Sequence, residues 1–505
     1  MLSADVAVVG GGIAGCAAAL AAARAGANVM LLTKLPDPDD TNTRWAQGGI
    51  IYTGPDDAPE LLVKDVLAAG AGASSPEAAR ILATEGPQQV RELLIEELGV
   101  EFDHDGAGLS LAREGAHSAA RILHQKDSTG WAIQRALAAA VRAEPRVTPL
   151  YGAEALSLTV EDGRCVGLEV LLDGEAVQVR ARSVVLATGG LGALYAHTTN
   201  PDHATGDGVA LAIQAGAAIR DLHYVQFHPT ALYAPGGNRF LVSEAVRGEG
   251  AVLLDADGQE FIEHPLGSLA PRDVVAREMW ETGQRSGAPC AHLHLPSRSE
   301  GWFRERFPAI FAKCVEAGIN VPDEPIPVTP AAHYSCGGVE TDEHGRTSVR
   351  GLWAAGEVAR TGLHGANRLA STSLLEGLVW GRRAGKDAAR PSVQAPTPTT
   401  AVPTAVASGA EVGQEVLAAR WARLRETMWE YAGLARSGDG LRRGLSELAT
   451  LKCEIGGAQD VESLRLRRAL LVATRLTADA LADPVSRGCH YRTDSYNVEP
   501  ARLPG

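Results

Sequence analysis

The stretch Asp5–Gly15, which reads DVAVVGGGIAG, decides the fold of this 505-residue chain. Its apolar run leads directly into a Gly-x-Gly-x-x-Gly turn that begins at Gly10. An alanine-rich stretch continues to Arg24, and a second apolar run spans Val29–Leu32. This order predicts a strand, a tight turn, a helix and a second strand, with the helix N-terminus placed to receive a pyrophosphate. A plain tight turn is the alternative, and the βαβ context favours a dinucleotide site.

The residues after the second strand depart from the pattern of an NAD site. Such a site usually has an acidic residue there, which holds a ribose hydroxyl. In this chain Thr33 and Lys34 occupy the position instead. The departure favours another dinucleotide, or a different grip on the same one.

Composition and charge exclude several classes of function. The hydrophobic fraction of 45% and the charged fraction of 21% are ordinary values for a globular protein. The net charge of -14 makes nucleic acid and an anionic membrane poor partners. An anionic substrate would therefore need a local cluster of Arg and His side chains.

The cysteine pattern indicates a reducing compartment. The seven cysteines are scattered and form no Cys-x-x-Cys pair, so we expect no zinc site, iron–sulfur cluster or disulfide framework. We also expect no signal peptide ahead of the first strand, and no uncharged run has membrane-spanning length. These features predict a cytoplasmic protein without a bound metal.

The chain is expected to divide into an α/β nucleotide-binding domain with a long insertion and a helical C-terminal region. Segments 182–187 and 352–355 read as strands that end in glycines, which suggests one Rossmann-like domain interrupted between them. A Pro/Thr/Ala tract reads as a linker, and three helical patterns follow it. The predicted boundaries are 1–222 and 331–390 for the nucleotide-binding domain, 223–330 for an α+β capping domain, 391–408 for the linker and 409–505 for a helical bundle.

Four polar stretches combine Gly, Arg and His in a way that core packing does not require. They are QFHPT (Gln226–Thr230), PRD (Pro271–Asp273), AHY (Ala332–Tyr334) and TGLHGANR (Thr361–Arg368). Taken singly, each His or Arg is more simply a structural hydrogen-bonding residue. Taken together, two His and two Arg predict a cationic pocket for a small dianion.

The same stretches resemble the fumarate reductase/succinate dehydrogenase flavoprotein family, and within it the L-aspartate oxidase branch. The resemblance covers nearly the whole chain. Its matching runs are GGGIAG (Gly10–Gly15), WAQGGI (Trp45–Ile50), LATGG (Leu186–Gly190), TGDG (Thr205–Gly208), QFHPTALY (Gln226–Tyr233), SEAVRGEGA (Ser243–Ala251), LAPRDVVAR (Leu269–Arg277), PAAHYSCGGV (Pro330–Val339), GLWAAGEV (Gly351–Val358) and TGLHGANRLASTSLLE (Thr361–Glu376).

Three features of the chain distinguish the branches of that family. Asn42 stands where succinate dehydrogenases carry the His that binds flavin covalently, so the resemblance implies non-covalent FAD. The run Arg113–Ser118 resembles the aspartate oxidase pattern, and its Glu114 matches a residue proposed to orient a substrate amino group. The end of the chain, Ser486–Asp494, also resembles that branch.

The resemblance implies which residues hold FAD. The glycine turn would receive the pyrophosphate, Lys34 would lie near the adenosine part, Glu357 would hold a sugar hydroxyl, and Ser373 with Leu374 would reach the ring system. The implied cofactor residues are Gly10, Gly11, Gly12, Ile13, Ala14, Gly15, Lys34, Asn42, Thr43, Arg44, Trp45, Ala46, Gln47, Gly48, Gly49, Asp207, Glu357, Ser373 and Leu374.

It also implies a substrate and a reaction. L-aspartate would lose a hydride from Cα to FAD and become iminoaspartate, and O2 or fumarate would reoxidise the flavin. The imine would feed quinolinate synthase and thus NAD biosynthesis. The two carboxylates would be held by His228, His333 and Arg368 with help from Ser243, and Glu114 would pair with the ammonium group.

Arg272 matches the family's proton donor or acceptor, with Glu244 and Arg247 setting its electrostatics. A carboxylate clamp is the rival role, because an Arg side chain is a poor base at neutral pH. The nearest alternative function is a soluble fumarate reductase or the flavoprotein subunit of a membrane complex. A flavoprotein that has lost catalysis and serves as a binding partner is the alternative of another class.

Overall fold

The structure is a computed structural model that describes residues 1–106, 108–234, 239–390, 413–456 and 460–495. The expected linker at 391–408 lies outside the described residues, as do the first four residues of the expected helical region. Within the described ranges, no helix is long and apolar enough to cross a membrane.

A seven-stranded sheet contains the expected βαβ unit. Its order is β8-β2-β1-β11-β10-β9, with β18 paired to β11. The strands β8, β2, β1, β11 and β18 run parallel, so segments far apart in the chain share one sheet. The strands are β1 (Leu2–Val9), β2 (Val29–Thr33), β8 (Val147–Tyr151), β9 (Glu154–Glu161), β10 (Arg164–Leu172), β11 (Glu175–Leu186) and β18 (Leu352–Ala354).

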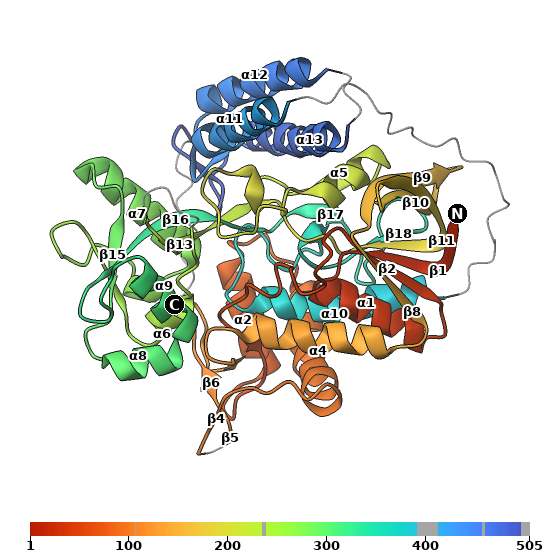
Figure 1. Ribbon diagram of the computed structural model, residues 1–505. Coiled ribbons are helices and arrows are strands. Elements are labelled where there is room, and N and C mark those ends of the chain that lie inside the picture. The colour runs from red at the N-terminus through yellow and green to blue at the C-terminus, as the bar shows by residue number, and fades with distance from the viewer. Residues whose placement is uncertain (107, 235–238, 391–412, 457–459, 496–505) are drawn as a thin grey trace.

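Helices cover both faces of this sheet, because alternate residues of β1 point to opposite sides. Val6 and Val8 pack in a core with α1, α4 and α10, whereas Ala7 and Val9 pack in a second core with α5 and the C-terminal helices (Figure 1). The helices around the sheet are α1 (Ile13–Arg24), α2 (Pro59–Ala69), α3 (Pro76–Gln89), α4 (Thr129–Ala143), α5 (Asp207–Gln214) and α10 (Thr372–Ala388).

The helices α1 and α10 lie in backbone contact, side by side in Figure 1. A Cβ atom at Gly381 would overlap the carbonyl oxygen of Ala14, and one at Gly385 would overlap that of Ala18. These glycines therefore set the distance between the two helices. Since α1 starts at the glycine turn, the contact also places the start of α10 beside that turn.

The inserted segment forms a second layer around a four-stranded sheet of order β13-β16-β15-β14 (Figure 1). It also carries a core of its own. The expected boundary at residue 330 falls inside a continuous strand, β16. The elements are β13 (Val225–Leu232), α6 (Glu244–Gly248), β14 (Val252–Leu254), α7 (Arg272–Ser286), β15 (Ala291–His294), α8 (Glu300–Arg306), α9 (Pro308–Glu316) and β16 (Ile326–Ser335).

Three C-terminal helices form the bundle that the periodicity predicts: α11 (Gln414–Ala432), α12 (Gly438–Ile455) and α13 (Val461–Ala482). Their apolar faces are buried at Leu417, Leu424, Met428, Leu441, Leu448 and Leu451. The chain then returns to the body of the molecule, where the Cys489 amide donates to the carbonyl oxygen of Ala366.

Short elements connect these layers. They are β3 (Ile50–Ile51), a π-helical turn (Val90–Glu97), β4 (His104–Asp105), β5 (Gly108–Leu109), β6 (Leu111–Ala112), β7 (Ile122–Leu123), β12 (Ile219–Arg220), β17 (Gly338–Glu340), β19 (Ala359–Arg360), β20 (Ala435–Arg436), β21 (Tyr491–Arg492) and three single 3-10 turns at 192–194, 267–269 and 356–358.

We expect Gly385→Ala to destabilise the protein. The added methyl group overlaps backbone of α1, and overpacking of about 2 kcal/mol or more exceeds the gain of about 1 kcal/mol in helix propensity. Denaturant unfolding monitored by circular dichroism measures the change. Gly301→Ala on α8 is the matched control, because a Cβ there meets no atom within 4 Å. Equal stability of the two variants would contradict the role of the α1–α10 contact.

Candidate active site

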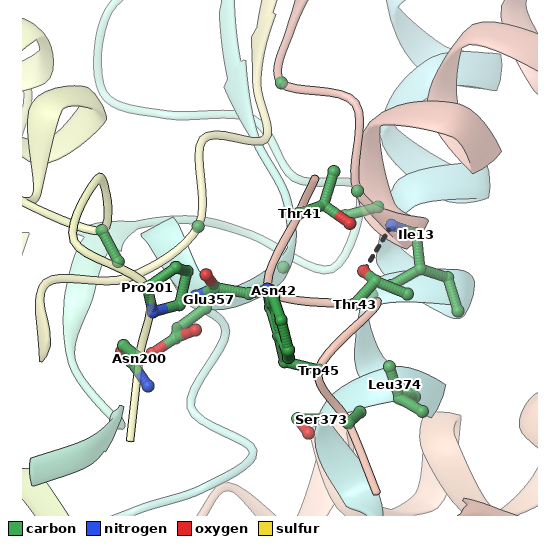
Figure 2. A pocket seen from close by; sticks show the side chains of 18 of the residues that line it. Ile13, Thr41, Asn42, Thr43, Trp45, Asn200, Pro201, Glu357, Ser373 and Leu374 are labelled. Atoms are coloured by element: carbon green, nitrogen blue, oxygen red, sulfur yellow. Dashed lines mark hydrogen bonds between the residues drawn. The ribbon is translucent and has the colours of Figure 1, made fainter. Parts of the chain in front are cut away.

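One continuous pocket runs from the glycine turn to the capping segment. Its walls come from the turn after β1, the loop 40–49, the ends of β11 and β18, the start of α10 and the cap. Figure 2 shows side chains from the start of α1, the loop 40–49, the turn after β18 and the start of α10, with Asn42 and Glu357 pointing toward one another.

The floor of the pocket at the glycine turn is bare backbone. Gly10 has φ +113°, and a Cβ there would overlap the carbonyl oxygen of Ala187 on the neighbouring strand. A Cβ at Gly11 would lie 2.7 Å from the Thr33 methyl group. Side chains are thus excluded where a pyrophosphate has to approach the N-terminus of α1.

The loop 40–49 closes over this turn. The Ile13 amide donates to Thr43 Oγ1 at 3.0 Å, the dashed line in Figure 2. Two of the expected cofactor residues do not line the pocket. Gly15 is packed against the carbonyl oxygen of Gly10, and the Arg44 guanidinium lies 4.4 Å from the centre of the Trp131 ring. Arg44 is drawn outward because that ring offers it a cation–π contact.

Lys34 has a partly buried carboxylate as its partner. Its Nζ lies 2.6 Å from Asp207 Oδ2 and 3.1 Å from the carbonyl oxygen of His203. Lys34 and Asp207, both expected cofactor residues, line the pocket. Burial favours the neutral acid, but the Lys34 ammonium outweighs it and lowers the pKa of Asp207. The position after β2, where an NAD site has an acidic residue, holds Thr33 and Lys34 in this chain. Asp207, the first residue of α5, places a carboxylate beside Lys34 instead.

Glu357 is a partly buried carboxyl group within reach of two donors. Its Oε1 accepts the Ser335 amide at 3.0 Å, and the Asn42 side chain also bonds to it. Burial raises the pKa of Glu357 to about 7, although those bonds and Arg368 oppose the shift. At neutral pH the group can therefore either donate or accept a hydrogen bond.

The pocket suits FAD. Several buried polar atoms on its wall have no hydrogen-bond partner among the residues that the structure describes, and a polar ligand would satisfy them: Gln47 Oε1, Thr188 Oγ1, Asn200 Oδ1 and Arg368 Nε. The bare glycine turn lies at one end and the Ser373–Leu374 start of α10 at the other. All expected cofactor residues other than Gly15 and Arg44 line this space.

Arg368 is the central cation at the end of the pocket near the cap. Its Nη1 donates to Ser373 Oγ at 3.1 Å and its Nη2 to His333 Nε2 at 3.0 Å, while the guanidinium lies 4.5 Å from the Tyr334 ring centre. Burial and the nearby Arg272 lower the pKa of Arg368 to about 10, which leaves it protonated at neutral pH.

The two His residues of the predicted cationic pocket are neutral at pH 7, so its positive charge lies on the two Arg side chains. Burial, together with neighbouring Arg side chains, lowers the pKa of both His228 and His333 well below 6.5. Because Arg368 can only donate, His333 carries its proton on Nδ1, 2.7 Å from Thr199 Oγ1. His228 Nδ1 accepts the Thr230 amide, so its Nε2–H can donate to a ligand. His333 thus supports Arg368 rather than adding a charge.

Arg272, the first residue of α7, is held by two side chains. Its Nε lies 2.5 Å from Glu244 Oε2, and its Nη1 donates to Gln226 Oε1 at 3.1 Å. Burial opposes ionisation of Glu244, but the Arg272 and Arg247 guanidinium groups lower its pKa. Arg272 is therefore fixed as a cation whose Nη2 has no hydrogen-bond partner among the described residues.

Glu114 is the second carboxylate of this region, and its pKa shifts in the direction opposite to that of Glu244. It is 3% exposed, and burial together with the Glu244 charge raises its pKa. Its Oε2 accepts a hydrogen bond of 2.5 Å from Ser371 Oγ. Its Oε1 lies on the side of Gly48, at the pocket.

The structure brings every expected substrate residue to this one pocket: Glu114, His228, Ser243, Glu244, Arg272, His333 and Arg368. Sequence reasoning missed wall residues that come from loops, among them Thr41, Thr188, Thr199, Asn200 and Ser371. The polar run that precedes TGDG contains Asn200 and Pro201, and it could have identified this part of the wall from the sequence. In the part of the chain that the structure describes, no group of three or more His, Cys, Asp and Glu side chains could hold a metal ion.

Comparisons with known proteins agree with this geometry. An FAD binding domain family matches residues 5–374, and a fumarate reductase flavoprotein C-terminal family matches 421–502. The chain is 45% identical to an L-aspartate oxidase of Halobacterium salinarum over 98% of both chains. It is also 45% identical to an L-aspartate oxidase of Streptomyces coelicolor, over 98% of this chain and 89% of that one.

A solved structure of E. coli quinol fumarate reductase with a mutation in FrdA has a TM-score of 0.89. The two sequences are 30% identical, and the match covers 99% of this chain and 93% of the matched chain. The predicted fold class and the predicted FAD-binding domain are both confirmed by these matches. The chain therefore belongs to the L-aspartate oxidase family of FAD-binding flavoproteins.

Proposed function

We propose that this chain oxidises L-aspartate to iminoaspartate with non-covalently bound FAD, as the first step of NAD biosynthesis through quinolinate. The observation that carries the proposal is the buried Glu114 carboxylate within a pocket whose other charges suit a dicarboxylate. Two guanidinium groups can hold two carboxylates, and one carboxylate can pair with an ammonium group. L-aspartate presents all three.

Arg368 and Arg272 bind the two substrate carboxylates in this proposal. Each guanidinium group is fixed by protein partners, and one nitrogen of each, Nε of Arg368 and Nη2 of Arg272, has no hydrogen-bond partner among the described residues. His228 donates from Nε2, and Ser243 also lines the wall. His333 positions Arg368, since both of its ring nitrogens are already bonded to protein groups.

Glu114 pairs with the ammonium group and takes one proton from it at Oε1. Its raised pKa makes it a stronger base than an exposed carboxylate. The amine left behind is neutral, and its lone pair assists departure of a hydride from Cα. FAD, when bound, supplies the two-electron acceptor for that hydride.

Arg272 serves as a carboxylate clamp during aspartate oxidation. It is held by Glu244 as a cation and is a poor base at neutral pH. A role as proton donor belongs to the reverse type of reaction, in which fumarate gains a hydride and needs a proton at the adjacent carbon.

Two further proposals rest on the family resemblance, and a third rests on the cysteine pattern. O2, giving hydrogen peroxide, or fumarate, giving succinate, reoxidises the flavin. The imine product passes to quinolinate synthase. The protein acts in the cytoplasm, as its scattered cysteines suggest.

Anaerobic mixing of the yellow holoenzyme with L-aspartate and, separately, with succinate tests the reaction. We expect L-aspartate alone to bleach the flavin and peroxide to appear when air is admitted. Absence of bleaching by L-aspartate, combined with rapid reoxidation of chemically reduced flavin by fumarate, would assign the chain to the fumarate reductase branch instead.

Replacing Arg368 is expected to weaken substrate binding. Arg368→Met removes a charge-assisted contact of about 1.5–3 kcal/mol, so KM for L-aspartate should rise about 10- to 150-fold. Arg368→Lys keeps the charge and should recover only part of the affinity, because a two-point contact is lost. Steady-state kinetics with FAD occupancy checked by absorbance measures both variants. An unchanged KM in Arg368→Met would remove this residue from the clamp.

Replacing Glu114 is expected to impair one activity selectively. Glu114→Gln keeps the size of the side chain but loses its charge and basicity, so kcat/KM for L-aspartate should fall at least about tenfold. Fumarate reduction by the same variant should change much less. Equal losses in the two assays would show that Glu114 does not recognise the amino group.

The affinity for succinate in Glu114→Gln is expected to depend little on pH. His228 and His333 have lowered pKa values, so both stay neutral from about pH 8 to pH 6.5, while the guanidinium groups stay charged. The dissociation constant, measured by flavin difference spectra, should change by less than about threefold over this range. Glu357 has a pKa of about 7 and is the pocket group that titrates in this range, so the same measurement is made in a variant that also carries Glu357→Gln. Binding that tightens about tenfold over one pH unit in that variant as well would indicate uptake of a proton by a His.

A further inference from the structure

Ser371, which lies immediately before α10, has a strained backbone. Its φ of +58° is in the left-handed region, which residues other than glycine rarely adopt. It is also the N-cap of α10, yet its hydroxyl accepts no hydrogen bond from that helix. At the starts of α3, α8 and α12, by contrast, Ser75, Ser299 and Ser437 each cap the helix in the usual way.

The Ser371 hydroxyl is used for Glu114 instead. It donates to Glu114 Oε2 at 2.5 Å across the pocket wall, and Ser371 is only 8% exposed. The left-handed backbone directs the hydroxyl away from the helix and toward the carboxylate. The strained backbone and the absence of a side-chain helix cap both lower stability. The hydrogen bond to Glu114 is the interaction that this conformation makes possible.

The Glu114 carboxylate has little room to adopt any other orientation. A Cβ at Gly48 would lie 2.7 Å from Glu114 Oε1 and 3.6 Å from Ser371 Oγ, so backbone packs directly against both groups. With Oε2 engaged by Ser371, Oε1 is the oxygen that is left on the pocket side.

A buried hydrogen-bond chain holds the two segments at this spacing. Arg121 donates to His117 Nδ1 at 3.3 Å, so the ring proton is on Nε2, which donates to the carbonyl oxygen of Ala370 at 3.0 Å. Arg121 is itself paired with Asp57 and Asp65. The segment of Glu114 is thereby tied to the residue just before Ser371.

We propose that Ser371 is a positioning residue that holds the Glu114 carboxylate toward the pocket and so sets the preference for amino-dicarboxylates over plain dicarboxylates. This rests on the proposed function. Ser371 acts through Glu114 and does not itself react. The same hydrogen bond favours the ionised carboxylate and limits the rise that burial causes in the pKa of Glu114.

Two variants of Ser371 separate this role from a purely structural one. Ser371→Ala removes the hydroxyl and keeps the strain, whereas Ser371→Gly removes the hydroxyl and relieves the strain. We expect kcat/KM for L-aspartate to fall at least about tenfold in both holoenzymes, with a change of less than about twofold in the dissociation constant of succinate. The Tm of Ser371→Gly should be higher than that of Ser371→Ala. If kcat/KM for L-aspartate instead falls only in the variant with the lower Tm, the loss reflects stability and the proposal is overturned.

The pH profile gives a second readout. Without the hydrogen bond to its charged form, Glu114 binds a proton at higher pH. The acid limb of kcat/KM for L-aspartate should therefore move to higher pH in both variants. An unshifted limb would overturn the proposal.

The remaining comparisons are a matched control and a double variant. Ser299→Ala removes a helix cap remote from the pocket, and we expect a lower Tm with unchanged selectivity. In a Glu114→Gln background, Ser371→Ala should cause no further loss of selectivity, since its effect passes through the carboxylate.

A wild-type flavin that L-aspartate does not reduce would overturn the proposed function and this inference together. A wild-type flavin that is reduced, with selectivity retained in both Ser371 variants, would overturn the inference alone.

Discussion

The backbone contact between α1 and α10 is the constraint on which the rest of the site depends. Gly381 and Gly385 allow α10 to approach Ala14 and Ala18 more closely than any side chain would permit. Both helices begin at the pocket, α1 at the glycine turn and α10 beside Ser373. Their closeness therefore joins the place for a pyrophosphate to the place for a ring system, although the two segments lie at opposite ends of the nucleotide-binding domain.

The electrostatics of the pocket follow from burial more than from residue type. Burial lowers the pKa of His228 and His333 well below 6.5, so both stay neutral and the positive charge belongs to Arg368 and Arg272. Two neighbouring carboxyl groups also diverge. Glu244 has a lowered pKa beside the guanidinium groups, whereas Glu114 has a raised one. Such a divergence between neighbouring acids lets one serve as a fixed counter-charge and the other exchange a proton.

A large part of the fold could be predicted, because the patterns concerned are local. The βαβ unit follows from the strand–glycine–helix order, and the three C-terminal helices follow from apolar periodicity. Most pocket residues also lie in recognisable motifs. Arg44 does not line the pocket because motif membership does not decide the direction of a side chain, and its guanidinium group lies over the Trp131 ring instead. Gly15 does not line the pocket because it packs against Gly10.

Local patterns along the chain specify the order of elements, the glycine positions that forbid side chains, and the set of Arg, His and Glu residues available to a dianionic ligand. The tertiary structure decided how those residues are charged and paired. His333 supports Arg368, Asp207 reaches Lys34 from another element, and Ser371 turns its hydroxyl toward Glu114. Each of these partners comes from a distant segment. A pKa or a side-chain direction depends on burial and on neighbours in space, and neither is encoded in a local pattern.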